Sequence, residues 1–457
     1  MKAVNKTLIA LAVAAISSPS FAAGFGLNAQ SATGVGRAIS GDAAIGDNAA
    51  ILARNPAGMA LFDSKALSVG MSYLDVDVNI KDVSVTLPGA IVGSPSDVAV
   101  PIGSEHSAAD NKFVPSIYYI QPINDQFAFG LAAFTNFGTG TDTSALQGGE
   151  LIPGSELPKP EDLLGNTQLT TVNFNASLSY RINEMFSVGA GLDVIYGSGE
   201  VSRGSIPDGA GGAIQLVDVD ADGIGFGGIV GGLIEFNQDH RIGFSYRFSP
   251  EVTADGTTDK LSSEEGVPAR YQEMTVPLPD IFQIAGFHQV LPQLALHYTV
   301  QFTQWSTFDE ITMKDGVIAM GHPLLDGSAV PNEPLKEYQW EDSWLYSVGA
   351  TYSVTDQLDL RAGYMFDNGV IGELESISIP DSDRNWYTFG ATYRLDKHHS
   401  FDFGYAYVQG QDVEVTELSA ILTAGISEQV GALTPIYTTA TTRSNAQYFS
   451  LQYNYSF

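Results

Sequence analysis

The feature that most constrains the fold is a period of two in side-chain polarity, which recurs along the chain from residue 65 onwards. The clearest segment is the last, 445–457, where every second position from 449 is apolar: Phe449, Leu451, Tyr453, Tyr455 and Phe457. The positions between them hold Ser, Gln and Asn. Successive side chains of a β-strand point to opposite faces, so such a strand offers one face to lipid and the other to a polar lumen.

Fourteen segments of this kind can be delimited, with the approximate bounds 65–79, 112–120, 127–138, 169–180, 186–199, 223–236, 240–253, 280–290, 294–308, 343–353, 358–366, 384–395, 400–409 and 445–457. Short turns and long loops alternate strictly between them, which gives seven hairpins with both termini on the short-turn side. Bacterial outer-membrane barrels have this even strand number and this asymmetry of connections. The sequence therefore predicts an all-β fold, a 14-stranded antiparallel transmembrane β-barrel over residues 65–457. The alternative is a soluble β-solenoid or sandwich.

The composition agrees with a barrel and narrows the possible functions. Charged residues make up 16% of the chain, against roughly 25% in soluble domains. The net charge of −31 argues against nucleic acid as a partner, because phosphate binding depends on Lys and Arg. The chain has no cysteine, so thiol chemistry and disulfides are excluded. No cofactor-binding, metal-binding or catalytic constellation is identified, and we expect no enzyme.

The first residues have the pattern of a secretory signal peptide. Two lysines precede an apolar run over 8–16, which is too short to span a bilayer, and a Ser-Phe-Ala motif ends at residue 22. We therefore expect residues 1–22 to be removed and the protein to reach the Gram-negative cell outer membrane.

The ends of the predicted strands carry two further signals. Phe457 resembles the usual last residue of chains that are handed to the outer-membrane assembly machinery. The four tryptophans fall near predicted strand ends, where an aromatic girdle at the membrane interface is expected: Trp305, Trp340, Trp344 and Trp386.

Residues 23–64 differ from the rest, since they are rich in Gly, Ala, Ser and Asn and show no strand alternation. A barrel of fourteen strands has a lumen wide enough to pass water unless something fills it. We therefore expect residues 23–64 to plug the lumen.

This segment contains three recognisable motifs, Ala23-Gly24-Phe25-Gly26-Leu27-Asn28, Gly36-Arg37-Ala38 and Arg54-Asn55-Pro56-Ala57. Further stretches of the same kind are Leu278-Pro279-Asp280, Ile379-Pro380-Asp381 and the closing Tyr453-Asn454-Tyr455-Ser456-Phe457. Together they closely resemble the FadL-type long-chain fatty acid and hydrophobic compound transporters of the outer membrane, and the resemblance covers nearly the whole mature chain. It implies that residues 23–64 are the N-terminal hatch of that family.

The resemblance also implies a gate. In the family the Asn-Pro-Ala tripeptide, here Asn55, Pro56 and Ala57, lies against a kink in the third strand, where the wall opens laterally. The matching kink would include Asn136, Phe137 and Gly138, since Gly in a strand often marks a bend. On the residues alone, Asn55-Pro56 is equally a turn that leads into the first strand, and 136–138 an ordinary strand end.

The ligand of such a transporter is a long-chain fatty acid or another hydrophobic small molecule. Phe25 and Leu27 are the expected apolar contacts. Strand parity places Arg247, Arg361 and Arg384 on the lumen face, where each could bind a carboxylate head group. The alternative is that each arginine pairs with an acid of the lumen. By order along the chain, the resemblance also implies capture on the loops 200–222 and 254–279.

These interpretations predict passive uptake of long-chain fatty acids, with lateral release through the kink into the outer-membrane lipids. Uptake of aromatic or other neutral hydrophobic compounds is the alternative within the same family. A barrel hydrolase and a non-specific porin are the rivals from other classes.

Overall fold

The computed structural model describes residues 24–155, 157–207, 212–262, 266–319, 327–372 and 374–457. The predicted signal peptide, residues 1–22, lies outside the described residues. No helix in the described part of the chain is both long and apolar enough to cross a membrane.

Most of the described chain is β-structure. The strands are β1 (Ala66–Leu87), β2 (Val98–Glu105), β3 (Lys112–Pro122), β4 (Phe127–Phe134), β5 (Gly138–Asp142), β6 (Gly165–Arg181), β7 (Phe186–Arg203), β8 (Ser205–Pro207), β9 (Ala213–Gln215), β10 (Val217–Asn237), β11 (His240–Phe248), β12 (Glu251–Leu261), β13 (Pro268–Arg270), β14 (Glu273–Pro277), β15 (Ile281–Leu291), β16 (Leu294–Thr303), β17 (Glu310–Lys314), β18 (Gly316–Ile318), β19 (Ala329–Val330), β20 (Glu333–Glu337), β21 (Ser343–Thr355), β22 (Leu358–Asp367), β23 (Arg384–Arg394), β24 (His399–Gly410), β25 (Val413–Leu418) and β26 (Tyr437–Ser456). The helices are α2 (Ala32–Gly36), α3 (Gly89–Val92) and α4 (Ala420–Val430), and the short 3-10 turns are η1 (Ala49–Ala53), η2 (Pro56–Leu61), η3 (Ser144–Leu146) and η4 (Trp305–Thr307).

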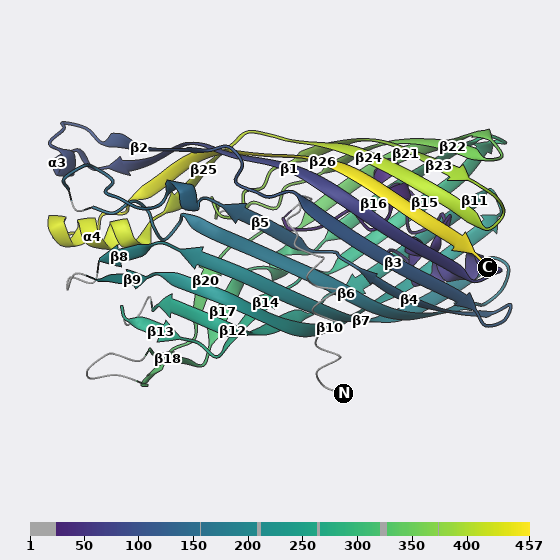
Figure 1. Cartoon of the computed structure of the whole chain (residues 1–457), viewed down its shortest axis with the longest axis horizontal. Helices are drawn as coiled ribbons and strands as arrows, with labels where there is room; N and C mark the ends of the chain where they lie inside the picture. Colours follow the sequence, from purple (N-terminus) through teal and green to yellow (C-terminus); the bar gives the residue numbers. More distant parts are fainter. Residues whose placement is uncertain (1–23, 156, 208–211, 263–265, 320–326, 373) are drawn as a thin grey trace.

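The strands close into a ring by antiparallel pairing. The order around it is β1, β3, β4, β6, β7, β10, β11, β15, β16, β21, β22, β23, β24 and β26, and β26 pairs with β1. Closure satisfies the backbone groups that an open sheet edge would expose to lipid. The predicted 14-stranded antiparallel barrel is therefore confirmed. The strands tilt strongly against the long axis of the barrel (Figure 1).

The alternation of side chains follows the predicted parity. Leu451 on β26 is 65% exposed on the outer face, whereas its neighbour Gln452 is 3% exposed and faces inwards. Exposed outward residues of other strands are likewise mostly aliphatic or aromatic. The outer surface is therefore apolar, as a lipid-facing wall must be.

The predicted strand ends are wrong on the long-loop side. β1 runs to Leu87 rather than to residue 79, and the predicted loops 254–279, 309–342 and 410–444 contain the strands β12 to β14, β17 to β20 and β25. Alternating apolar residues continue inwards beyond the expected end of β1, as at Val83 and Val85, both fully buried. Figure 1 shows these strands extending the barrel at the end opposite the C-terminus and the short turns, towards α3 and α4.

Residues 24–60 are almost entirely buried, although they form only short helical pieces. Each piece begins with a polar cap, since the side chains of Ser31, Asn48 and Asn55 accept hydrogen bonds from the first turns of α2, η1 and η2. Inward-facing side chains from separate parts of the ring bond to this segment's carbonyl groups. They include Tyr118 of β3, which donates to Gln30 O at 2.8 Å, and Ser245 of β11, which donates to Arg54 O at 2.6 Å.

Candidate functional site

The third strand of the ring is interrupted along its length. Its first part, β4, ends at Phe134 opposite Asn173 of β6, and its second part, β5, begins at Gly138 opposite Thr170. Three residues, 135–137, therefore face two on β6, which is the geometry of a β-bulge.

The same interruption separates the third strand from β3. Pairing between β3 and β4 stops at Ile117 and Ala133, and β5 pairs with β6 alone among the described strands. Residues 112–116 of β3 keep their partners in β1 but have no ladder partner in the described part of the third strand. The ladder between β3 and the third strand therefore ends at this point, which we call the wall break.

The start of the N-terminal segment takes up hydrogen bonds at the wall break. Leu27 N donates to Asn136 O at 2.7 Å, and Gly138 N donates to Phe25 O at 2.8 Å. Gly26 lies across from Phe137 as an antiparallel bridge pair. The segment thus bonds to backbone groups that the interrupted ladder leaves over.

Aromatic rings surround Phe25 beside the wall break. Its ring centroid lies 4.7 Å from Trp305, 4.8 Å from Phe308, 5.5 Å from Trp340 and 5.9 Å from Phe137. With Tyr338, which lies 4.8 Å from Phe308, these residues form what we call the aromatic cluster: Phe25, Phe137, Trp305, Phe308, Tyr338 and Trp340. The cluster belongs to a larger apolar core that also contains Val201 and Ile379. Such a surface offers a hydrocarbon tail an environment free of water.

The predicted apolar residues Phe25 and Leu27 belong to different parts of the interior. Phe25 lies in the aromatic cluster, whereas Leu27 packs into a second core with Leu345, Met365 and Trp386. Both side chains are buried.

The predicted tryptophan girdle is wrong for three of its four members. Trp305, Trp340 and Trp386 are buried inside, and Trp344 alone, at 42% exposure, stands on the outer face. Trp386 shares the inward parity of Arg384 on β23, whereas Trp305 and Trp340 lie outside the strands. Proximity to a strand end alone therefore does not show whether a ring faces outwards or inwards.

An apolar hollow lies on the wall next to the break. Its volume is about 610 Å³, and its lining includes Met71, Ile117, Ala133, Phe174 and Leu451. Ile117 and Ala133 are also the last paired residues of β3 and β4. The hollow therefore adjoins the place where the ladder ends.

Asn55, Pro56 and Ala57 lie away from the wall break. The Asn55 carboxamide donates to Ala43 O at 2.8 Å and to Gly232 O of β10 at 3.0 Å, and its oxygen accepts from Ala57 N at 3.0 Å. The residues that bond to the break are instead Phe25, Leu27 and Gln30. The placement implied by the family resemblance, with Asn-Pro-Ala against the kink, therefore differs from the contacts found.

Glycines of the wall let the Asn55 turn approach the strands closely. A Cβ added to Gly231 of β10 would lie 2.1 Å from the Asn55 side-chain oxygen, and one added to Gly189 of β7 would lie 2.5 Å from the Ala57 nitrogen. Only a residue without a side chain fits at these two positions.

Replacing Gly231 by alanine is therefore expected to lower the free energy of unfolding by about 1–3 kcal/mol, the usual cost of overpacking. Urea unfolding in detergent micelles would measure it. The matched control is Gly425→Ala in α4, where an added Cβ meets nothing within 4 Å and alanine is the better helix former. Equal stability of the two variants would contradict the close packing of the Asn55 turn.

Each of the three arginines predicted to bind a head group already has an acidic partner. Arg247 pairs with Asp193, Arg384 pairs with Asp381, and Arg361 lies 3.5 Å from Asp47. This is the alternative that the sequence left open. The structure gives none of these three arginines an advantage as a head-group ligand.

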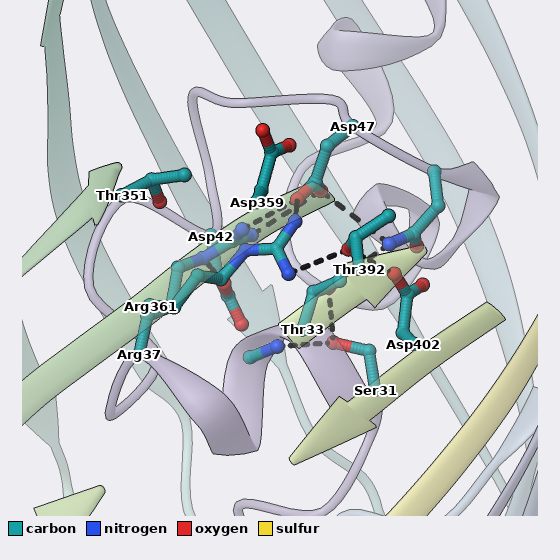
Figure 2. Close-up of polar contacts among 12 residues, drawn as sticks. Ser31, Thr33, Arg37, Asp42, Asp47, Thr351, Asp359, Arg361, Thr392 and Asp402 are labelled. Carbon is teal, nitrogen blue, oxygen red and sulfur yellow. Dashed lines mark hydrogen bonds and ion pairs between the residues drawn. The ribbon is translucent and has the colours of Figure 1, made fainter. Parts of the chain in front are cut away.

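The Arg361 pair belongs to a charge network that is buried except at Asp47, whose side chain is 25% exposed (Figure 2). Arg37 bonds to Asp42 at 2.8 Å and to Asp47 at 2.6 Å, and Arg361 donates to Thr392 at 2.6 Å. Burial alone would raise the pKa of the Asp47 carboxyl, but the charges of Arg37 and Arg361 outweigh it and lower this pKa to about 2. Asp47 therefore stays ionised at neutral pH and holds the N-terminal segment to β22.

Two buried arginines that the sequence reasoning passed over have no ion-pair partner within the described residues, Arg54 and Arg203. Arg203, 6% exposed at the end of β7, donates to Asn166 O, Ser202 O and Thr167 Oγ1, each at 2.8 Å. Parity along β7 could have found it, because Arg203 shares the inward face with Asp193. The predicted loop 200–222 instead includes the end of β7.

Arg203 lies beside the aromatic cluster. Its charge acts on the Tyr338 phenol and on the Lys336 ammonium, and the carboxylates of Glu417 and Asp162 act on Arg203 from beyond ion-pair distance. Lys336 bonds to Glu417 at 2.5 Å and to Ser376 at 2.7 Å, and its ammonium lies 5.6 Å from the Tyr338 ring. A cationic group and an apolar region therefore adjoin each other, which is the combination that a fatty acid needs.

Two comparisons with known sequences match most of the chain. The model of the family described as outer membrane protein transport protein (OMPP1/FadL/TodX) matches residues 13–457. The long-chain fatty acid transport protein of Escherichia coli strain K12 is 30% identical, over 90% of this chain and 94% of that protein.

Solved structures agree in fold. A Pseudomonas aeruginosa FadL homologue superposes with a TM-score of 0.74 at 23% identity, covering 95% of this chain and all of that one. The toluene transporter TbuX of Ralstonia pickettii gives a TM-score of 0.62 at 16% identity, over 94% of this chain and 99% of that one.

Proposed function

The chain belongs to the OMPP1/FadL/TodX family of outer-membrane transport proteins, and from this premise we propose that it carries long-chain fatty acids across the outer membrane by passive diffusion. The members of this family are transporters or channels rather than enzymes. Transport of hydrophobic compounds in the Gram-negative outer membrane follows from the family, and the fatty acid is our proposal.

The observation that carries the proposal is that the buried Arg203, which makes no ion pair within the described residues, lies near the aromatic cluster. A fatty acid tail exposed to water costs about 0.8 kcal/mol per CH₂, so the tail favours the aromatic cluster. The carboxylate favours a buried guanidinium, where a charge-assisted bond is strong. A neutral aromatic compound would use the cluster but would gain nothing from Arg203.

The proposed route continues through the wall. Residues 23–64 act as the hatch, and their hydrogen bonds to 136–138 keep the wall break closed. When residues 25–27 leave the wall break, the ligand passes sideways into the apolar hollow and the outer-membrane lipids. The concentration gradient supplies the driving force.

The direct test measures the uptake of oleate and of toluene into vesicles that contain the purified protein. We expect oleate uptake well above that of empty vesicles. Uptake of toluene alone would instead support the aromatic alternative.

A plugged lumen also predicts low ion conductance. Residues 24–60 are almost entirely buried, and two cavities beside Arg54 measure only about 30 and 10 Å³. In planar bilayers we expect a conductance far below that of an open porin, because a water-filled lumen is what carries ions. A large, steady conductance would favour the porin and count against the hatch.

A further inference from the structure

Arg54 is a buried cation held by neutral groups. It is 6% exposed and ends the short turn η1. Its guanidinium donates to Gln30 Oε1 at 2.7 Å, to Asn28 Oδ1 at 3.0 Å and to Gln301 Oε1 at 3.2 Å. No carboxylate of the described residues lies within ion-pair distance, and Arg54 Nε has no hydrogen-bond partner among them.

A small polar cavity lies beside this guanidinium. Its volume is about 30 Å³, and Arg54, Gln30, Asn136 and Gln301 are among its lining residues. A polar site of this size holds a water molecule or a group of similar size, such as a carboxylate. The buried Asn136 Nδ2 also lacks a hydrogen-bond partner within the described residues. The cavity lining therefore holds a second donor, besides Arg54 Nε, that could bind an oxygen atom.

The cavity joins the aromatic cluster to the wall break. Phe137 and Trp305 line the cavity and also belong to the aromatic cluster, so a tail lying among these rings can place its head group next to Arg54. Asp367 lies on the lining too, and Asp42 and Arg247 act on the Arg54 charge from greater distance. An anion with the geometry of a carboxylate suits a guanidinium held by neutral amides.

Gln30 connects Arg54 to the wall break directly. Its carboxamide oxygen accepts from Arg54, while its nitrogen donates to Thr135 O at 3.0 Å and to Asn136 Oδ1 at 3.1 Å. A carboxylate that binds Arg54 competes with the Gln30 oxygen. It thereby loosens the bonds that the same side chain makes to residues 135 and 136.

We propose that Arg54 is a second carboxylate-binding site, which receives the head group of a long-chain acid after the aromatic cluster and weakens the Gln30 bonds at the wall break. This inference rests on the proposed function. It adds that the charged head group itself favours opening, so that acids pass faster than their uncharged analogues.

The test compares oleate with oleyl alcohol in vesicle uptake assays of the full-length protein. Arg54→Gln is expected to slow oleate uptake by about tenfold or more and to leave oleyl alcohol uptake unchanged. Gln30→Glu should abolish the advantage of oleate over oleyl alcohol, because it places a permanent carboxylate on Arg54 and removes the amide that donates to Thr135 O and Asn136 Oδ1. This second variant also pairs the buried charge, so its folding does not depend on an empty guanidinium site.

The control is Arg241→Gln, a partly buried arginine whose guanidinium lies 4.7 Å from the centre of the Phe287 ring. Its uptake of both probes should equal that of the unaltered protein. Equal slowing of oleate and oleyl alcohol in Arg54→Gln, unchanged oleate uptake in Arg54→Gln, or a retained advantage of oleate in Gln30→Glu would each overturn the Arg54 assignment. If the unaltered protein carries neither probe, the proposed function itself fails.

Discussion

Replacing Arg203 by glutamine is expected to weaken oleate binding by about 30-fold or more, with little effect on oleyl alcohol. Glutamine keeps hydrogen-bond donors near Asn166 O and Thr167 Oγ1 but removes the charge. Loss of one partner from a buried, hydrogen-bonded charge pair costs roughly 2–5 kcal/mol, and each 1.4 kcal/mol is a factor of about ten in affinity.

Quenching of tryptophan fluorescence by brominated analogues of the two ligands would report this binding, because Trp305 and Trp340 lie in the aromatic cluster. The control is Arg270→Gln, an exposed arginine of β13 that pairs with Asp259 at 2.6 Å. Equal loss of both ligands in Arg203→Gln would show a packing defect instead of a lost head-group contact.

The second large effect concerns the wall break. A disulfide between cysteines placed at 26 and 137 is expected to reduce oleate uptake to the level of empty vesicles, and reduction should restore it. Gly26 and Phe137 form a bridge pair whose flanking residues make the hydrogen bonds. In antiparallel pairs of this kind the Cα atoms are about 4.5 Å apart, which falls within the span of a disulfide.

The natural chain has no cysteine, so within one molecule the two introduced cysteines can form a disulfide only with each other. The reduced double variant serves as its own baseline, since it already lacks the Phe137 ring. Undiminished uptake through the oxidised protein would mean that residues 25–27 need not leave the wall break during transport.

The sequence was sufficient for the ring and insufficient for the site. Alternation is a local property, so positions such as Leu451 and Gln452 could be assigned to opposite faces without any knowledge of neighbours. The partners of Arg247 and Arg384 depend on which strands and loops meet, and no pattern within one strand encodes that. Arg203 was missed for a simpler reason: β7 continues to Arg203, beyond the predicted strand end at residue 199, where polar residues favour a loop.

The contacts of Asn55 show a related limit. On its residues alone, Asn55-Pro56 is a candidate turn into the first strand, and in the structure Asn55 caps η2. Its neighbours turned out to be Ala43 and the glycines of β7 and β10. Long-range packing of a segment without its own core is set by the shape of the surrounding wall, which no single stretch of the chain describes.

The bonds between residues 25–27 and 136–138 have a consequence for how this molecule responds to stabilisation. Global unfolding breaks the pairing of fourteen strands, whereas release of residues 25–27 from the wall break breaks only a few local contacts. The two processes therefore depend on separate sets of interactions. Variants stabilised by stronger strand pairing elsewhere would therefore keep their permeation rate. Substitutions at the wall break could in turn change the permeation rate without lowering the stability of the barrel.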